Sequence, residues 1–335
     1  MATQTATPPG TVSEEAIRET ALAQTISRPS RSLWKDAWHR LLRNKAAVLG
    51  ALVIVFFLAV AALAPYIAPH DPLMIYSGKG FSPPSFVQPP APGEPVFIFG
   101  TDYLGRDVLS RVIYGARVSM IVGFVPVVII LIIGVSIGLY AGYRGGRTDN
   151  LLMRLTDIVY AFPALLFYII VMTALRDSAL GQLMSGMILL FISLALVSWV
   201  GCARLVRGQV LSLKRKEFVE AARMIGATDT EILIKHILPN SLSPIIVTTA
   251  FLIPALIITE ATLGYLGLGL RPGTDSREFF VTSWGSLLLE GQPALNSQPW
   301  LLAVPALCLA VVVLAFNYLG DGLRDALDPR LAGTE

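Results

Sequence analysis

Residues 118–142, VSMIVGFVPVVIILIIGVSIGLYAG, form an unbroken run without a single charged side chain. A helix needs about 20 mostly apolar residues to cross the hydrocarbon core of a bilayer. This run is long enough to cross. It therefore predicts a transmembrane helix, and it places the chain among the integral membrane proteins.

Five further apolar stretches are long enough to cross a bilayer, at 46–68, 158–175, 183–203, 244–270 and 300–320. With 118–142 they predict an all-α bundle of six transmembrane helices, because backbone groups in lipid must be satisfied within each segment. Six crossings place both termini on one side of the membrane.

The composition agrees with a membrane protein. Hydrophobic residues make up 54% of the 335 residues and charged residues 15%, against roughly 25% charged in an average soluble domain. For the chain as a whole, so few charges exclude a soluble domain, a secreted disulfide scaffold, a mainly disordered protein and a DNA-binding module, and no nucleic-acid partner is expected. Cys202 and Cys308 both lie in apolar runs, where buried free thiols are the usual interpretation.

Basic residues predict the orientation. The N-terminal segment, the 143–154 loop, the 204–236 loop and the C-terminus hold 19 of the 26 lysines and arginines. Because cytoplasmic segments carry the excess of these residues, both termini are expected in the cytoplasm. The first apolar run begins far into the chain and is longer than the core of a signal peptide, so a cleaved signal is not expected.

The segments outside the spans have distinct compositions. Residues 1–30 read as a flexible cytoplasmic tail, and 31–45, which mixes tryptophans with basic residues, as an amphipathic helix at the inner headgroup boundary. The external segment 69–115 is rich in proline, which disfavours helix and central strand. Residues 321–335 read as a cytoplasmic tail.

Two features inside the spans concern packing or transport. Gly134, Gly138 and Gly142 stand four residues apart, a spacing that lets two helix backbones approach closely. Glu260 is the one charged residue in the stretch 244–270. An ionisable side chain there is costly unless it faces a cavity or a partner. It could line a transport pathway or lock neighbouring helices together, and the sequence leaves both open.

The cytoplasmic loop at 204–243 is too long for a simple connection. Its residues LSLKRKEFVEAARMIGATDTEILIKHILPNSLSP, at 211–244, predict two short helices. The apolar residues of the first helix recur at helical spacing, at Phe218, Ala221, Ala222 and Ile225.

Turn signals follow the first helix of this loop. Gly226 can end it in a left-handed conformation, and Thr228 with Glu231 forms a capping box for the second helix. That helix is expected to stop at Pro239, after Leu238. An apolar stripe centred on two alanines suits a knob that fits into a groove on another surface. The alternative is a surface helix that rests on its own bundle.

Several motifs resemble one family. The pattern E-A-A-x-x-x-G followed by L-P resembles the signature of permease subunits of ATP-binding-cassette (ABC) importers. It is carried by Glu220, Ala221, Ala222, Gly226, Leu238 and Pro239. His236 stands where the general pattern has isoleucine, as in oligopeptide-type members. Further similarity to the C-type permease of oligopeptide and dipeptide importers lies in FGTDYLGRDVLSRVIYGARVS (99–119), RLVRGQVLSLKRKEF (204–218), SWGSLL (283–288) and NYLGDGLRDALDP (317–329).

The resemblance implies a fold and a set of partners. The fold is the type I importer permease, with its domain at 116–320 and a coupling helix at 216–227 that docks on a cytoplasmic ATPase. The implied partners are a homologous permease subunit in a heterodimer, two ATP-binding subunits and an extracytoplasmic substrate-binding protein, in a bacterial cytoplasmic membrane. No cofactor is expected on this chain, because ATP and magnesium belong to the ATPase subunits.

The expected function is therefore transport rather than catalysis. The sequence has no G-x-x-x-x-G-K-[ST] phosphate loop, no H-E-x-x-H motif and no G-x-S-x-G motif, which argues against an enzyme. The expected cargo is an oligopeptide or dipeptide. Alternatives are nickel chelates or another non-peptide solute on the same architecture, or an ion-driven secondary transporter, which would carry more intramembrane charges.

Overall fold

The computed structural model of the chain describes residues 33–271, 273–275 and 277–328. The expected tail at 1–30 lies outside the described residues, as do the last residues of the expected tail at 321–335. The regular elements described are helices, and Thr101 and Asp107 form an isolated antiparallel bridge. The predicted all-α fold is confirmed.

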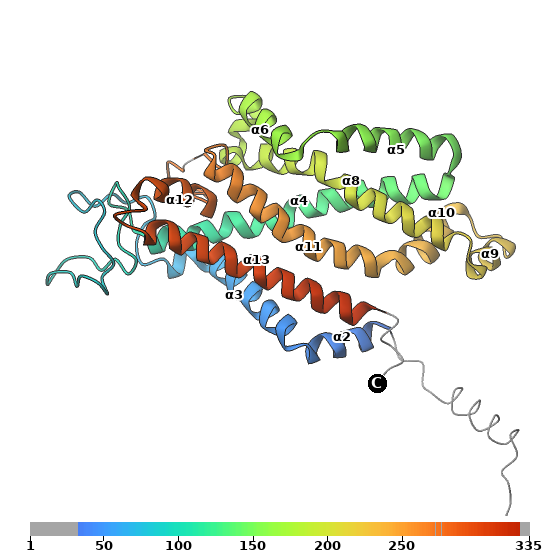
Figure 1. Cartoon of the computed structure of the whole chain (residues 1–335), viewed down its shortest axis with the longest axis horizontal. Helices are drawn as coiled ribbons and strands as arrows, with labels where there is room; N and C mark the ends of the chain where they lie inside the picture. Colours follow the sequence, from blue (N-terminus) through green and yellow to red (C-terminus); the bar gives the residue numbers. More distant parts are fainter. Residues whose placement is uncertain (1–32, 272, 276, 329–335) are drawn as a thin grey trace, which may run out of the picture.

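Long helices run side by side along the molecule (Figure 1). The longer elements are α2 (Leu33–Arg43), α3 (Lys45–Ile67), α4 (Val108–Arg144), α5 (Gly146–Ala161), α6 (Ala164–Leu175), α8 (Met187–Leu213), α11 (Leu238–Tyr265) and α13 (Trp300–Leu327). The short elements are α7 (Ala179–Gln182), η1 (Leu183–Gly186), α9 (Glu217–Met224), α10 (Asp229–Glu231), η2 (Ile232–Ile237), α12 (Trp284–Gly291) and η3 (Gln292–Ala294).

Within the residues that the structure describes, five helical stretches are long and apolar enough to cross a membrane, or six if the bent pair α5 and α6 counts as one span. The bend between α5 and α6 is 78°. It falls at Phe162 and Pro163, where the helix ends because proline disfavours helical backbone in the residue before it. The apolar stretch at 158–175, expected as one span, is therefore divided between two helices.

Helices α4, α8 and α13 extend beyond the expected spans. Helix α4 has 37 residues and is about 55 Å long, so it is longer than the hydrocarbon core of a bilayer, which is about 30 Å thick. Helix α8 continues to Leu213 and α13 to Leu327. Charged and polar residues at these ends had limited the expected spans, although such residues continue a helix readily once it leaves the hydrocarbon.

Helices α4 and α8 pack at close range through glycines. A Cβ atom built on Gly134 would lie 2.7 Å from Cβ of Cys202, and one on Gly138 would lie 2.6 Å from the carbonyl oxygen of Ala203. Gly142 faces Val210 in the same way. The close helix packing predicted from the glycine spacing is confirmed.

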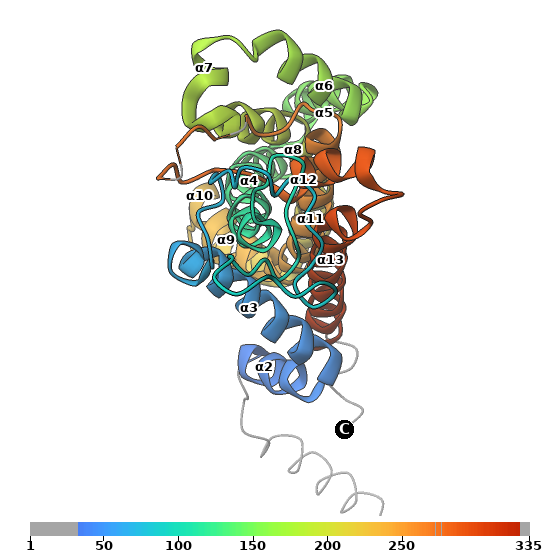
Figure 2. The same ribbon diagram turned by 90° about the vertical axis from the view of Figure 1, so that its left-hand side faces the viewer.

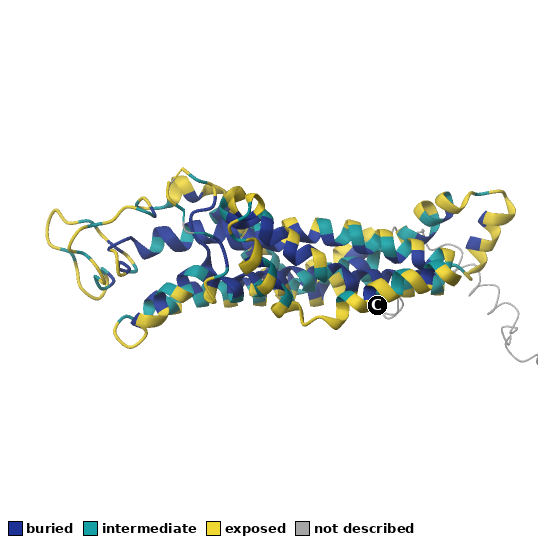
Figure 3. Ribbon diagram, turned by 90° about the horizontal axis from the view of Figure 1, so that it is seen from above, coloured by how far each residue is buried: buried dark blue, intermediate teal, exposed yellow. Residues whose placement is uncertain are grey.

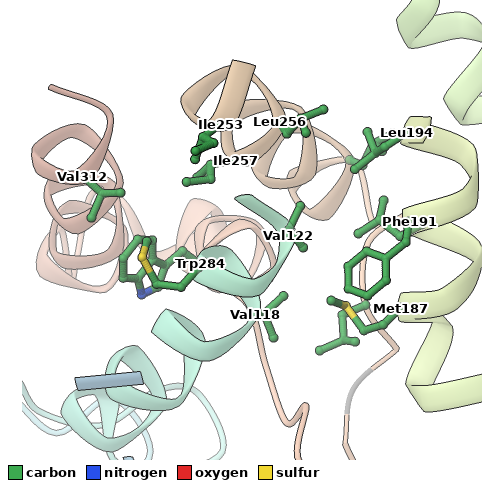
Figure 4. Packing of buried hydrophobic residues seen from close by; sticks show 14 of the residues in the cluster. Val118, Val122, Met187, Phe191, Leu194, Ile253, Leu256, Ile257, Trp284 and Val312 are labelled. Carbon is green, nitrogen blue, oxygen red and sulfur yellow. The ribbon is translucent and has the colours of Figure 1, made fainter. Parts of the chain in front are cut away.

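The buried core lies where α4, α8, α11, α12 and α13 meet, and buried residues concentrate along the middle of the bundle (Figures 3 and 4). Trp284 of α12 is fully buried there and donates from Nε1 to the carbonyl oxygen of Val112 at 2.9 Å. Its contact with the backbone of α4 fixes α12 against the bundle.

The segment between α3 and α4 covers the end of the bundle near α12 (Figure 2). It has irregular backbone, as its prolines predict. Turn hydrogen bonds hold it, including those from Phe81 N to Asp102 O at 2.8 Å and from Tyr76 N to Gly105 O at 3.3 Å. Gln298, just before α13, donates to Phe81 O at 3.0 Å. These contacts tie the segment to the bundle.

Helix α2 lies against the last turns of α13. Ala37 is buried, and Leu41 faces Gly322 of α13. Trp34, Trp38 and Leu42 lie on a different face and are more than half exposed. Nothing in the described chain covers these side chains, as expected for a helix at the membrane surface.

Candidate functional site: the loop between α8 and α11

The loop between α8 and α11 lies at the opposite end of the bundle from α12 (Figure 1). Its first helix, expected at 216–227, is α9 (Glu217–Met224). Ile225 caps the helix and Gly226 follows with φ of 89°. This left-handed backbone explains the glycine, because other residues adopt it only at a cost.

One face of α9 packs on the chain's own bundle. Val219 is fully buried and Ala222 is 4% exposed. They belong to one cluster with Ile232 and Ile237 of η2 and with the end of α8. This contact fixes the position of α9 relative to the bundle.

The other side of α9 is exposed. Phe218 is 40% exposed, Met224 88% and Ile225 87%, and Glu220 and Ala221 are exposed as well. Large apolar side chains seldom stay exposed in this number at one helix end without a partner. An apolar protrusion therefore forms at this end of the molecule.

The expected stripe of Phe218, Ala221, Ala222 and Ile225 is divided by the structure. Ala222 points inward with Val219, whereas the other three are exposed. The sequence analysis overlooked Val219 and Met224. The i, i+3 spacing of Val219 and Ala222 could have indicated a buried face, but spacing alone does not tell which face a neighbouring element covers.

Hydrogen bonds anchor the loop to α4. The Tyr143 hydroxyl of α4 donates to Asp229 Oδ1 at 2.7 Å, and Arg223 Nη2 donates to the Tyr143 oxygen at 3.4 Å. Lys214 Nζ, just after α8, donates to Gly142 O at 2.7 Å. The loop is thus joined to α4 by hydrogen bonds and to the end of α8 by apolar packing.

The turn after α9 has the predicted capping box. The backbone N–H of Glu231 donates to Thr228 Oγ1 at 3.3 Å, and that of Thr228 donates to Glu231 Oε2 at 3.0 Å. The expected stop at Pro239 is wrong. Leu238 and Pro239 lie in the first turn of α11, where a proline without N–H is tolerated. The chain continues from Asp229 through the π-helix η2 into the membrane helix.

Glu260 lies far from this loop, towards the other end of α11. It is fully buried, and its carboxylate oxygens make no hydrogen bond of good geometry among the described residues, although the Ser283 side chain lies beside them. The neighbouring Ala261 is so close to α12 that a Cβ on Gly285 would lie 2.7 Å from its Cα. Glu260 is therefore enclosed by packed helices in this chain.

Potential metal ligands do not gather in the described part of the chain, where no group of three or more His, Cys, Asp or Glu side chains is placed to hold an ion.

Residues 134–333 match a family described as "Binding-protein-dependent transport system inner membrane component". The chain belongs to this family. Residues 32–84 match a second family, the "N-terminal TM domain of oligopeptide transport permease C". The resemblance drawn from the E-A-A-x-x-x-G pattern and the flanking motifs is thereby confirmed.

Curated relatives of this permease cover nearly its whole length. It is 40% identical to the oligopeptide transport system permease protein OppC of Bacillus subtilis over 96% of this chain and 98% of that protein. It is 39% identical to the dipeptide permease protein DppC of the same species over 92% of this chain and 89% of that one. OppC of Escherichia coli K12 is 39% identical over 92% and 95%.

Among solved structures, a chain of the MetNI methionine ABC transporter in an inward-facing conformation has a TM-score of 0.50 and 18% identity. The match covers 65% of this permease and 96% of that chain, and it shows a shared fold. The type I importer permease fold expected from the resemblance is confirmed. As the membrane component of an ABC importer, the permease is a multi-pass membrane protein and not itself the catalytic subunit.

Proposed function

We propose that this permease forms half of the pathway through which peptides enter the cell, delivered by an external binding protein and driven by partner ATPases. Its similarity to oligopeptide and dipeptide permeases over nearly the full chain carries the proposal. A glutathione permease of Pectobacterium atrosepticum is 38% identical over 90% of the chain. These three curated relatives are named for oligopeptide, dipeptide and glutathione transport, and glutathione is itself a tripeptide.

The exposed end of α9 is the proposed contact with an ATPase. Phe218, Ala221 and Ile225 supply apolar surface, and Met224 adds to it. Glu220 supplies a charge at the edge of the contact. Ala222 does not face the ATPase in this proposal; it packs on the bundle and so positions α9.

The end of the loop has a structural part in this proposal. The left-handed turn at Gly226 sets the angle between α9 and the next helix, and Leu238 with Pro239 begins the membrane helix that would follow any movement of the loop. ATP and magnesium would bind on the ATPase subunits. The complete importer would contain a homologous permease subunit, two ATPases and the binding protein.

The orientation in a bacterial cytoplasmic membrane is part of the proposal. The excess of basic residues around α9 supports a cytoplasmic location for the loop and both termini. A Gln88→Cys variant should react with a membrane-impermeant maleimide added to intact cells, and a Ser212→Cys variant should not. Both positions are exposed in the chain, so labelling of Ser212→Cys from outside would refute this topology.

Uptake tests the function directly. The permease would be expressed with its partner subunits and binding protein in a host that lacks other peptide importers. A mixture of dipeptides to pentapeptides would be supplied, and internalised peptides measured by mass spectrometry. Uptake that requires both this chain and ATP is expected. Uptake of nickel chelates or another non-peptide solute in place of peptides would overturn the peptide assignment.

A further inference from the structure

Tyr143 occupies a junction of three helices. It lies in the last turn of α4, and its ring packs against the cluster that contains Val219 and Ala222. Its hydroxyl donates to Asp229 at 2.7 Å and accepts from Arg223 at 3.4 Å. Arg223 belongs to α9, and Asp229 is the first residue of α10.

No other hydrogen bond joins α4 to α9 or α10 within the described residues. Apart from this hydroxyl, α9 meets the rest of the chain through apolar packing. The packing of Val219 and Ala222 seats α9 on the bundle, and the hydrogen bonds of the Tyr143 hydroxyl add a directional contact to it, because a hydrogen bond depends on angle as well as distance. The Tyr143 hydroxyl therefore sets how α9 and α10 are aligned on α4.

The two helices that meet at Tyr143 span the molecule. Helix α4 runs from this junction to the external end, where Arg111 bonds Asp102. From Asp229 the chain continues without a break through η2 and α11 to Tyr265, past the buried Glu260. If a displacement of α9 moves both α4 and the helical stretch from Asp229 to Tyr265, each of these two helices carries the movement to the far end of the bundle.

We propose that Tyr143 is a positioning residue for energy coupling: its hydroxyl makes α4 and the α10–α11 helix move together when an ATPase displaces α9. The inference rests on the proposed function, because it assumes that α9 is the ATPase contact. It adds the group through which the contact acts on the membrane helices. A phenol suits this place, because its oxygen donates to one neighbour and accepts from the other.

The test uses the assembled importer with Tyr143→Phe, which removes the hydroxyl and keeps the ring. Tyr140→Phe is the matched control, because Tyr140 lies one turn earlier in α4 and its hydroxyl makes no side-chain hydrogen bond within the described residues. We expect the ATPase subunits to co-purify equally with both variants. Alanine tripeptide taken up per ATP hydrolysed should fall about 3- to 10-fold for Tyr143→Phe, as expected when the short bond to Asp229 and the longer one from Arg223 are both lost, and stay at the wild-type value for Tyr140→Phe.

A second variant separates coupling from a general loss of structure. Asp229→Ala removes the acceptor and should lower the same ratio, and the double variant should be no worse than the lower single one if both act through one bond. An unchanged ratio for Tyr143→Phe, or additive losses in the double variant, would overturn the inference. So would loss of the ATPase from Tyr143→Phe, because the residue would then act in docking. A separate outcome concerns the proposed function: if the ATPase of the wild-type importer does not contact α9, the ATPase contact proposed above is itself wrong.

Discussion

Arg106 Nη2 donates to Glu290 Oε2 at 2.8 Å, and these two residues are 184 positions apart in the sequence. Arg111 also bonds Glu290, and both arginines bond Asp102, each at 2.6 Å. The four side chains join the segment between α3 and α4, the start of α4 and α12. The segment that covers this end of the permease is therefore held by ion pairs as well as by backbone hydrogen bonds.

Glu290→Ala should destabilise the permease. Arg111 is only 3% exposed, and the variant would leave its buried guanidinium with one carboxylate in place of two. Breaking a buried pair costs about 3–5 kcal/mol, and the partial exposure of Glu290 reduces this to about 2–3 kcal/mol. The thermal unfolding midpoint of the permease in lipid nanodiscs is the measurement.

Glu94→Ala is the control for the Glu290 variant. Lys79 holds the pKa of Glu94 below its ordinary value through a hydrogen bond, but Glu94 is exposed and Lys79 is one-third exposed, and ion pairs at the surface stabilise little. Its unfolding midpoint should match the wild type. An equal loss in both variants, or none in Glu290→Ala, would contradict a stabilising role for the external ion pairs.

Gly138→Ala should separate α4 from α8. The added methyl would lie 2.6 Å from Ala203 O and 2.7 Å from Cβ of Val206, so the helices must move apart, at a cost of about 1–3 kcal/mol. Gly208→Ala is the matched control in α8, because its methyl would meet nothing within 4 Å. That control should keep or slightly raise the unfolding midpoint, since alanine favours helix over glycine. Equal effects from the two variants would argue against tight packing at Gly138.

Glu260 should act through packing rather than as a pathway residue. It is enclosed within this chain, and replacing an unpartnered buried polar group by an apolar one of similar size is often neutral or stabilising. We therefore expect Glu260→Gln and Glu260→Leu to assemble and to retain peptide uptake within about twofold. Normal assembly with lost uptake in both variants would instead assign the carboxylate to the pathway.

The sequence predicted the helical bundle and the helical loop well, because both depend on local patterns. Long uncharged runs indicate membrane helices. The capping box of Thr228 and Glu231 marks a helix start within four residues. The burial of Ala222 and the ion pairs of Glu290 could not be predicted from the sequence, because they depend on which distant element packs against each residue. Pro239 was misread for a related reason: a proline signals a helix stop or a helix start equally well, and only the preceding π-helix η2 makes it a start.

The last prediction concerns the exposed end of α9. Ala221→Trp adds a large ring to a surface that is exposed in this chain, so the permease should fold with its wild-type unfolding midpoint. Added volume in a close-packed contact costs about 1–3 kcal/mol, which corresponds to roughly 5- to 150-fold weaker binding of the ATPase. Co-purification of the ATPase subunits and peptide uptake should both fall.

Two further variants test whether this effect belongs to the exposed face. Ala222→Trp places the same ring among Val219 and Ile232, so it should lower the unfolding midpoint, which Ala221→Trp does not. Gly226→Val forces a β-branched residue into a backbone with φ of 89°, which is strained whatever space surrounds it, so it should misdirect α9 and reduce uptake. Wild-type ATPase co-purification and uptake with Ala221→Trp would show that α9 is not the coupling element, because no close-packed contact at this face would accept an indole in place of a methyl group.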